Sequence, residues 1–243
     1  ELFLGLIYFS FQIYCDFSGY SDIAIGTAKM FGVELRSNFI FPYFSRDISE
    51  FWRRWHVSLS SWFRDYIYIP LGGSKNGKWV SIRNIFIIFI ISGFWHGANF
   101  TFIAWGSIHS VLYLALVLSN KNRRYLTSIV SKNRAVPTFI ELYQISITFF
   151  MVTISWVFFR SGSILDSFLY LKKMLLNFDI PISYRSGIFY VILIIISDWL
   201  NRKDERKPLN ISSTNIRWII YVLMFILIIS HGGQKNEFIY FQF

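Results

Sequence analysis

Charged side chains are scarce in this sequence. Asp, Glu, Lys and Arg make up 16% of the residues, whereas 54% are hydrophobic and 21% are aromatic. A soluble domain usually has about 25% charged residues, so this chain has too few of them to coat a globule that faces water. The mean hydropathy of +0.44 points the same way. The composition therefore excludes an ordinary soluble domain and predicts a membrane protein.

Cysteine and several common site motifs are also nearly or wholly absent. Cys15 is the only cysteine, so an internal disulfide is excluded. There is no Cys-x-x-Cys pair, no His-Glu-x-x-His motif and no glycine-rich nucleotide loop. A serine-nucleophile elbow fails because Ile23 stands where Gly-x-Ser-x-Gly needs its last glycine. We therefore expect neither a metal site nor a bound cofactor.

Acidic residues are the rarer charge, with 14 Asp and Glu against 24 Lys and Arg, for a net charge of +10. A basic excess can indicate nucleic-acid binding, but here the basic residues follow apolar runs, as the positive-inside rule expects of cytoplasmic loops. The two basic groups are Lys121, Arg123, Arg124, Lys132, Arg134 and Arg202, Lys203, Arg206, Lys207. We expect contact with membrane lipid and no nucleic-acid partner.

Long uncharged apolar runs dominate the chain. Positions 84–120, 142–159 and 218–234 contain no Asp, Glu, Lys or Arg, and runs of about 18 such residues are candidate membrane spans. The pattern predicts helices near 2–32, 84–120, 137–159, 186–200 and 215–231. We expect an all-α fold, a polytopic membrane helical bundle with interfacial and broken or re-entrant helices, in one domain over residues 1–243.

Two segments combine apolar and charged residues. Asp16 and Asp22 lie in the first predicted helix, and because carboxylates are costly at membrane depth they should face protein or a water-filled cavity. The segment 47–68 mixes aromatic residues such as Trp55 with Arg64 and Asp65. Aromatic rings at headgroup level and Arg side chains that reach water are typical of the membrane interface, so we predict an interfacial segment.

The 84–120 run is too long to cross the membrane once. As one helix it would measure about 56 Å, against about 30 Å of hydrocarbon. Gly93 and Gly97 flank His96, and Asn99 follows, so the chain should break there. Irregular backbone inside a membrane must be buried in protein or line a water-filled cavity. We predict a broken helical hairpin that places His96 in a polar cavity, with the basic residues before and after the run on one side.

The four histidines differ in the role that we expect for each. A buried histidine can simply bridge helices, but an ionisable residue at a helix break in a membrane is by default functional, so His96 is our candidate general base. For His56 two interpretations stay open: a ring that lies at the membrane interface, or a second functional group. His109 and His231 fit packing or interface roles better.

Four motifs resemble those of the membrane-bound O-acyltransferase family, in its bacterial branch that modifies alginate and teichoic acid. They are residues 14–26, 51–60, 63–73 and 94–98, the last followed by Trp105-Gly106-x-x-His109, and residues 238–243 are also similar. The resemblance implies that His96 is the essential histidine and His56 its partner. It also implies that about half of a family member is missing before Glu1. Substrate-binding or supporting roles are expected for Asp16, Asp22, Trp55, Arg64, Asp65, Trp95, Asn99 and His109.

The expected reaction is acyl transfer from a thioester to a hydroxyl, for which His96, kept neutral by burial, would take the hydroxyl proton. The resemblance suggests acetyl-CoA or another acyl thioester as donor, an envelope polysaccharide as acceptor, a soluble acyltransferase on the envelope side as partner, and the bacterial inner membrane as location. D-alanyl transfer to teichoic acid is the alternative. A transporter, whose sites lie at broken helices, should show two repeated halves, and none is found. A non-catalytic assembly subunit also stays open.

Overall fold

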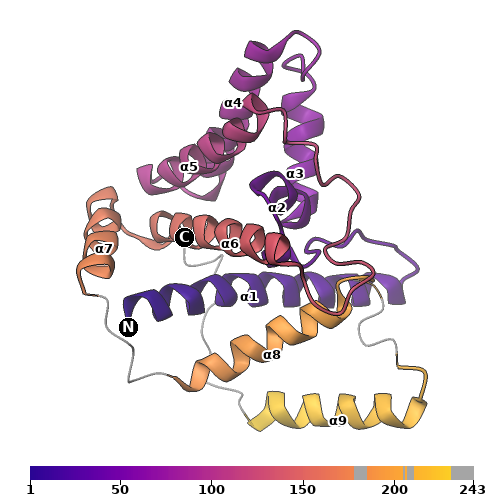
Figure 1. Cartoon of the computed structure of the whole chain (residues 1–243). Helices are drawn as coiled ribbons and strands as arrows, with labels where there is room; N and C mark the ends of the chain where they lie inside the picture. Colours follow the sequence, from indigo (N-terminus) through magenta and orange to yellow (C-terminus); the bar gives the residue numbers. More distant parts are fainter. Residues whose placement is uncertain (178–184, 205, 207–210, 231–243) are drawn as a thin grey trace.

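The computed structural model describes residues 1–177, 185–204, 206 and 211–230, and this part of the chain contains helices and no strands (Figure 1). The longer helices are α1 (Leu2–Met30), α4 (Lys78–His96), α5 (Phe100–Leu118), α6 (Phe139–Arg160), α7 (Ile164–Leu176), α8 (Ser186–Asn201) and α9 (Thr214–Ser230). Short helices α2 (Ile48–Arg54) and α3 (Val57–Phe63), a 3-10 turn η1 (Pro42–Phe44) and a π-helical turn η2 (Arg64–Tyr68) connect α1 to α4. The predicted all-α fold is confirmed.

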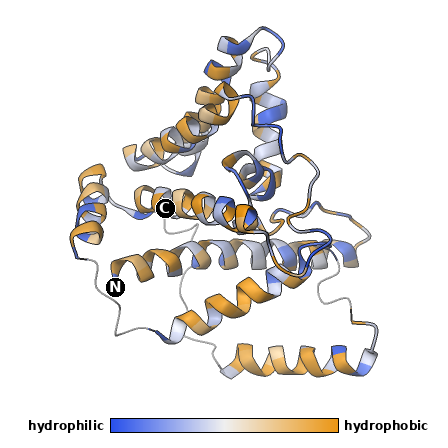
Figure 2. Ribbon diagram, viewed as in Figure 1, coloured by the Kyte–Doolittle hydropathy of each residue, from blue (hydrophilic) through white to orange (hydrophobic). Residues whose placement is uncertain are grey.

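Four helices are long and apolar enough to cross a membrane: α1, α4, α5 and α6. Helices α8 and α9 are apolar but shorter. Figure 2 shows hydrophobic residues along all six. The helix α7 was not predicted, because Asp166, Lys172 and Lys173 interrupt its apolar pattern.

Helices α4 and α5 form the predicted hairpin (Figure 1). Its base is closed by Lys78, whose Nζ donates to the carbonyl of Leu118 at 3.1 Å. Along its length the backbones nearly touch, since a Cβ added to Gly106 would collide with the carbonyl oxygen of Phe89. The break falls between His96 and Phe100, where it was predicted. The residues just before and just after the 84–120 run therefore lie at the same end of the hairpin.

Helix α6 packs between α1 and the hairpin and completes an aromatic core (Figure 1). Ser10 of α1 donates to Thr153 of α6 at 3.2 Å, inside the protein. Trp105 of α5 stacks on Trp156 of α6 with ring centroids 5.6 Å apart, and both are 1% exposed. This arrangement brings one end of α6, with Phe159, to the tip of the hairpin.

The interfacial prediction for residues 47–68 was wrong for its first half. Asp47 caps α2 by accepting from the backbone N–H of Glu50 at 2.7 Å, and α2 then enters the core, where Phe51 and Trp55 are 1% and 2% exposed. An aromatic-rich pattern cannot distinguish lipid headgroups from a protein core. The second half, with Trp62 51% exposed, lies at the surface, where the interfacial prediction still stands as a prediction.

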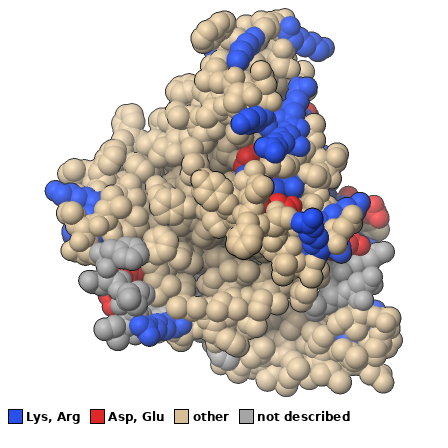
Figure 3. Space-filling model, in the orientation of Figure 1, with Lys and Arg blue, Asp and Glu red and all other residues tan. Residues whose placement is uncertain are grey.

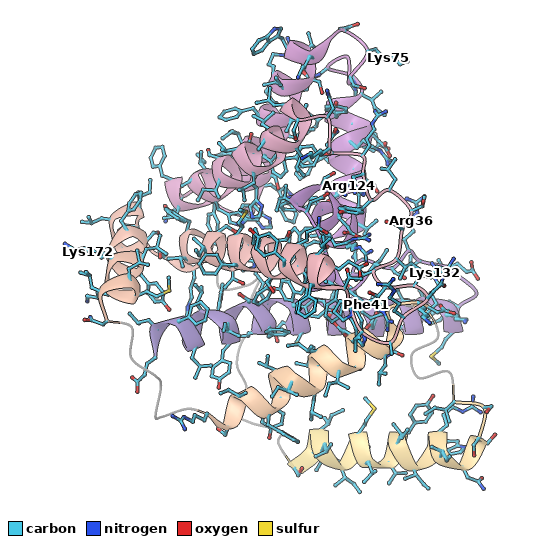
Figure 4. All side chains as sticks on the ribbon, viewed as in Figure 1. Arg36, Phe41, Lys75, Arg124, Lys132 and Lys172 are labelled. Atoms are coloured by element: carbon cyan, nitrogen blue, oxygen red, sulfur yellow. The ribbon has the colours of Figure 1, made fainter. Side chains whose placement is uncertain are left out.

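The largest groups of Lys and Arg side chains lie on the upper right of the view, and smaller groups lie on the left and lower left (Figure 3). Among the labelled residues of Figure 4, Arg36, Lys75, Arg124 and Lys132 lie on the right of the view, and Lys172 lies on the left. The tip of the α4–α5 hairpin points toward the left (Figure 1). The site histidine at that tip is therefore one helix length from the base of the hairpin, about 28 Å at 1.5 Å per residue.

Candidate active site

His96 is the last residue of α4 and sits at the tip of the hairpin. Rings surround its imidazole: Trp95 at 4.9 Å, Phe159 at 5.0 Å and Trp105 at 5.2 Å between centroids. The indole N–H of Trp105 is buried and has no hydrogen-bond partner among the described residues, so a bound oxygen atom could accept from it.

Asn99 was predicted to stand beside His96 in a polar cavity, and its side chain is instead hydrogen-bonded to the backbone. Its oxygen accepts from the N–H of Thr101 at 3.1 Å, and its amide donates to the carbonyl of Gly162 at 3.0 Å. It caps α5 and ties the hairpin tip to the segment after α6. A polar side chain near a helix break can thus form its hydrogen bonds with the backbone groups that the break leaves unpaired.

His56 lies between α2 and α3, in a left-handed backbone conformation with φ 44° and ψ 56°. Its ring packs against Phe17 of α1, with centroids 4.7 Å apart, and its Nδ1 is 3.4 Å from the hydroxyl of Ser58. The residue is 8% exposed. This burial lowers the pKa of His56 to about 4, so the imidazole is neutral at physiological pH.

Trp95 lies between the two histidines. Its indole is 4.9 Å from the ring of His96 and 6.3 Å from that of His56. The residue is 54% exposed, so one part of this group remains accessible. The inward folding of the segment that carries His56 is confirmed: two histidines 40 positions apart in the sequence meet at one indole.

His109 is fully buried on α5 and both ring nitrogens are paired. The indole N–H of Trp52 donates to Nδ1 at 3.3 Å. Nε2 therefore carries the proton and donates to Ser155 at 2.9 Å, and that hydroxyl donates to the carbonyl of Val152 at 2.7 Å. This chain joins α2, α5 and α6 and supports the packing role predicted for His109.

Asp22 lines a cavity of about 600 Å³ between α1, the segment after it and α8. The phenol of Tyr14 donates to Asp198 at 2.8 Å at this cavity. The expectation that Asp22 faces a cavity is confirmed. Asp16 is partly buried on the same helix.

Arg64 and Asp65 pair with each other on the π-helical turn, through hydrogen bonds of 2.7 and 3.1 Å. Their side chains are 58% and 47% exposed. The guanidinium of Arg64 lowers the pKa of Asp65. Trp55, by contrast, belongs to the core, where its ring lies 5.3 Å from that of Trp156. Among the predicted site residues, the structure thus brings His56 and His96 together at Trp95.

The described residues contain no group of three His, Cys, Asp or Glu side chains that could hold a metal ion. His231 and the motif at 238–243 lie outside the described residues. Sequence reasoning missed Asn38, which hydrogen-bonds the chain immediately after His56. No local signal marks it, because its partners are 19 and 20 positions away.

Comparisons with known proteins agree on one family. The sequence model of the membrane-bound O-acyltransferase family matches residues 2–156. A probable alginate O-acetylase from Pseudomonas aeruginosa is 43% identical over 164 residues, which are 68% of this chain and 29% of that protein. The peptidoglycan O-acetyltransferase of Helicobacter pylori is 40% identical over 167 residues, 68% of this chain and 30% of that protein.

A teichoic acid D-alanyltransferase from Streptococcus thermophilus is 38% identical over 116 residues, 44% of this chain and 28% of that protein. The chain thus spans about three tenths of the length of the curated relatives it matches. Both O-acetylating relatives match a longer part of it than the D-alanyltransferase does.

Proposed function

The chain belongs to the membrane-bound O-acyltransferase family and is a multi-pass membrane protein, and we propose that the whole protein transfers an acetyl group from a thioester to a hydroxyl of an envelope polysaccharide. One observation supports this most: His96 and His56 contact the same indole, that of Trp95, at the tip of the α4–α5 hairpin. Two imidazoles beside a half-exposed ring provide a proton acceptor and a second polar group at one place.

His96 is the proposed general base. The acceptor hydroxyl oxygen attacks the carbonyl carbon of the thioester while His96 takes the hydroxyl proton. The C–S bond then breaks, the imidazolium returns the proton to the departing sulfur, and an ester and a free thiol result. No covalent enzyme intermediate is required. His56 is the proposed partner, which orients a substrate or polarises the reacting carbonyl.

The position of the tip suits substrates that arrive from opposite sides. Basic residues lie at the base of the hairpin (Figure 4), which the positive-inside rule assigns to the cytoplasm. The tip lies about 28 Å away along α4, close to the full thickness of the hydrocarbon core. A cytoplasmic thioester, acetyl-CoA or another acyl thioester, would reach His96 from one side and the polysaccharide from the other. The proposed location is the bacterial cytoplasmic membrane, and a soluble acyltransferase of the envelope is the proposed partner.

The acetyl group is preferred to D-alanine because the O-acetylating relatives match 68% of the chain and the D-alanyltransferase 44%. The acceptors in their printed names, alginate and peptidoglycan, are both glycans. A glycan hydroxyl is therefore the proposed acceptor class.

The experiment replaces His96 by phenylalanine at the native locus and measures ester-linked acetate released from the envelope by mild base. Phenylalanine keeps a ring among Trp95, Trp105 and Phe159 but cannot take a proton. We expect a loss of about 10²–10⁴-fold in rate, with normal amounts of protein in the membrane. The matched control, Phe100→Ala, removes a ring that is 74% exposed at the same turn and should acetylate normally. Normal acetylation by the His96→Phe protein would refute the role of general base.

A further inference from the structure

The backbone at His56 adopts a conformation that a residue with a side chain rarely takes. Its φ of 44° lies in the left-handed region, which crowds Cβ against the following carbonyl. His56 is also the residue before α3, and its own side chain makes no capping hydrogen bond to that helix. The side chain of His56 therefore neither caps the first N–H groups of α3 nor offsets the strain of its own backbone.

Asn38, in the segment after α1, accepts two hydrogen bonds from the start of α3. Its backbone oxygen accepts from the N–H of Val57 at 3.0 Å, and its side-chain oxygen accepts from the N–H of Ser58 at 3.0 Å. These are the first two N–H groups of α3, which lack partners within the helix. The side-chain amide of Asn38 also lies 3.4 Å from the hydroxyl of Ser21 on α1.

The other side of His56 is held by the same segment. The backbone N–H of Ile40 donates to the carbonyl of Arg54 at 2.9 Å, and the guanidinium of Arg54 donates back to the carbonyl of Ile40 at 3.3 Å. Residues 38–40 thus pair with the chain on both sides of His56. The hydrogen bond from Ser58 to the side chain of Asn38 ties this segment to α3 and depends on the identity of residue 38.

We infer that Asn38 is a positioning residue for His56: it caps α3 in place of a local residue and so fixes the left-handed turn that holds the His56 ring beside Trp95. This inference rests on the proposed function, because it gives His56 a geometry that the acyl transfer uses. When the contact to Ser58 is lost, the turn can relax to an ordinary backbone conformation, and the imidazole then moves away from the indole.

Two variants separate the hydrogen bond from the bulk of the side chain. Asn38→Leu keeps a similar size but has no acceptor for Ser58. Asn38→Asp keeps the acceptor oxygen and should preserve the cap. Asn84→Leu is the matched control, because the side chain of Asn84 also serves backbone groups, the carbonyls of Leu71 and Gly73, and is more deeply buried than that of Asn38.

The first readout is the chemical accessibility of His56, measured in purified full-length protein by diethyl pyrocarbonate and mass spectrometry at pH 7. This reagent modifies neutral imidazole, the form that a pKa of about 4 gives His56. With Asn38→Leu we expect a severalfold faster modification of His56, whereas His109, 0% exposed, stays protected. Asn38→Asp should restore protection, and Asn84→Leu should leave it unchanged.

The second readout is envelope acetylation in cells. A displacement of about 1 Å can cost on the order of 100-fold in rate, so Asn38→Leu should fall to between a tenth and a hundredth of normal on this basis, and Asn38→Asp should recover most of the activity. Unchanged protection of His56, or equal exposure of His56 and His109, would overturn the positioning role. Cells that carry His96→Phe are assayed in parallel to separate the positioning role of Asn38 from the proposed acyl transfer. If acetylation is lost in His96→Phe cells but normal in Asn38→Leu cells, only the role of Asn38 is refuted.

Discussion

Alanine in place of Gly106 tests the close packing that shapes the hairpin. A Cβ at this position would overlap the carbonyl oxygen of Phe89 and lie 3.0 Å from its carbonyl carbon and 3.6 Å from the Cα of Gly93. All three are backbone atoms of α4, so no rotation of a side chain can relieve the overlap. The two helices must separate, and the tip that carries His96 must move with them.

The expected change in the unfolding free energy of Gly106→Ala follows from two opposing effects. Alanine is favoured over glycine inside a helix by about 1 kcal/mol, whereas overpacking of a tight contact costs about 1–3 kcal/mol. Gly26→Ala measures the first effect alone, because nothing lies within 4 Å of a Cβ at that position on α1. The difference in unfolding free energy between the two variants therefore isolates the steric cost.

The assay is thermal unfolding in detergent, followed by tryptophan fluorescence. For a chain of this size each kcal/mol corresponds to roughly 2–4 °C in Tm, so the Gly106→Ala protein should melt about 2–12 °C below the Gly26→Ala protein. Its acetylation should also fall, because the displaced tip moves His96 away from Trp105. If Gly106→Ala raises Tm as much as Gly26→Ala does, the helices do not pack as closely as described, and the argument that fixes His96 by this hairpin fails.

The hairpin was predictable because it follows from a local conflict between length and membrane thickness. The uncharged run exceeds one span, glycines mark where the backbone can depart from a helix, and His96 lies between them. Helix α1 was predictable for the same kind of reason, since its apolar run and its end near Gly32 are local features.

The surroundings of His96 were not predictable, because they depend on packing between distant helices. Phe159 reaches the imidazole from α6, and Trp105 reaches it from α5, while polar Asn99 turns to the backbone. The burial of α2 was missed for a related reason. Trp55 and Phe51 have the same sequence pattern at a membrane interface and in a core, and only the positions of α5 and α6 decide between them.

Two further experiments test the site and its sidedness. His56→Ala should reduce acetylation severely but incompletely, because the role proposed for His56 is to assist the base and not to replace it; acetylation at the normal level would contradict that role. The sidedness test uses Ser74→Cys and Arg123→Cys, one at a time, in a Cys15→Ser background. Since Lys78 and Leu118 meet at the base of the hairpin, both new thiols should react with an impermeant maleimide from the same side. The positive-inside rule predicts that this side, with its basic residues, faces the cytoplasm, so the reagent should label inverted vesicles and spare intact cells. Labelling from opposite sides would mean that the run crosses the membrane once, and the hairpin tip could not then carry His96 as described.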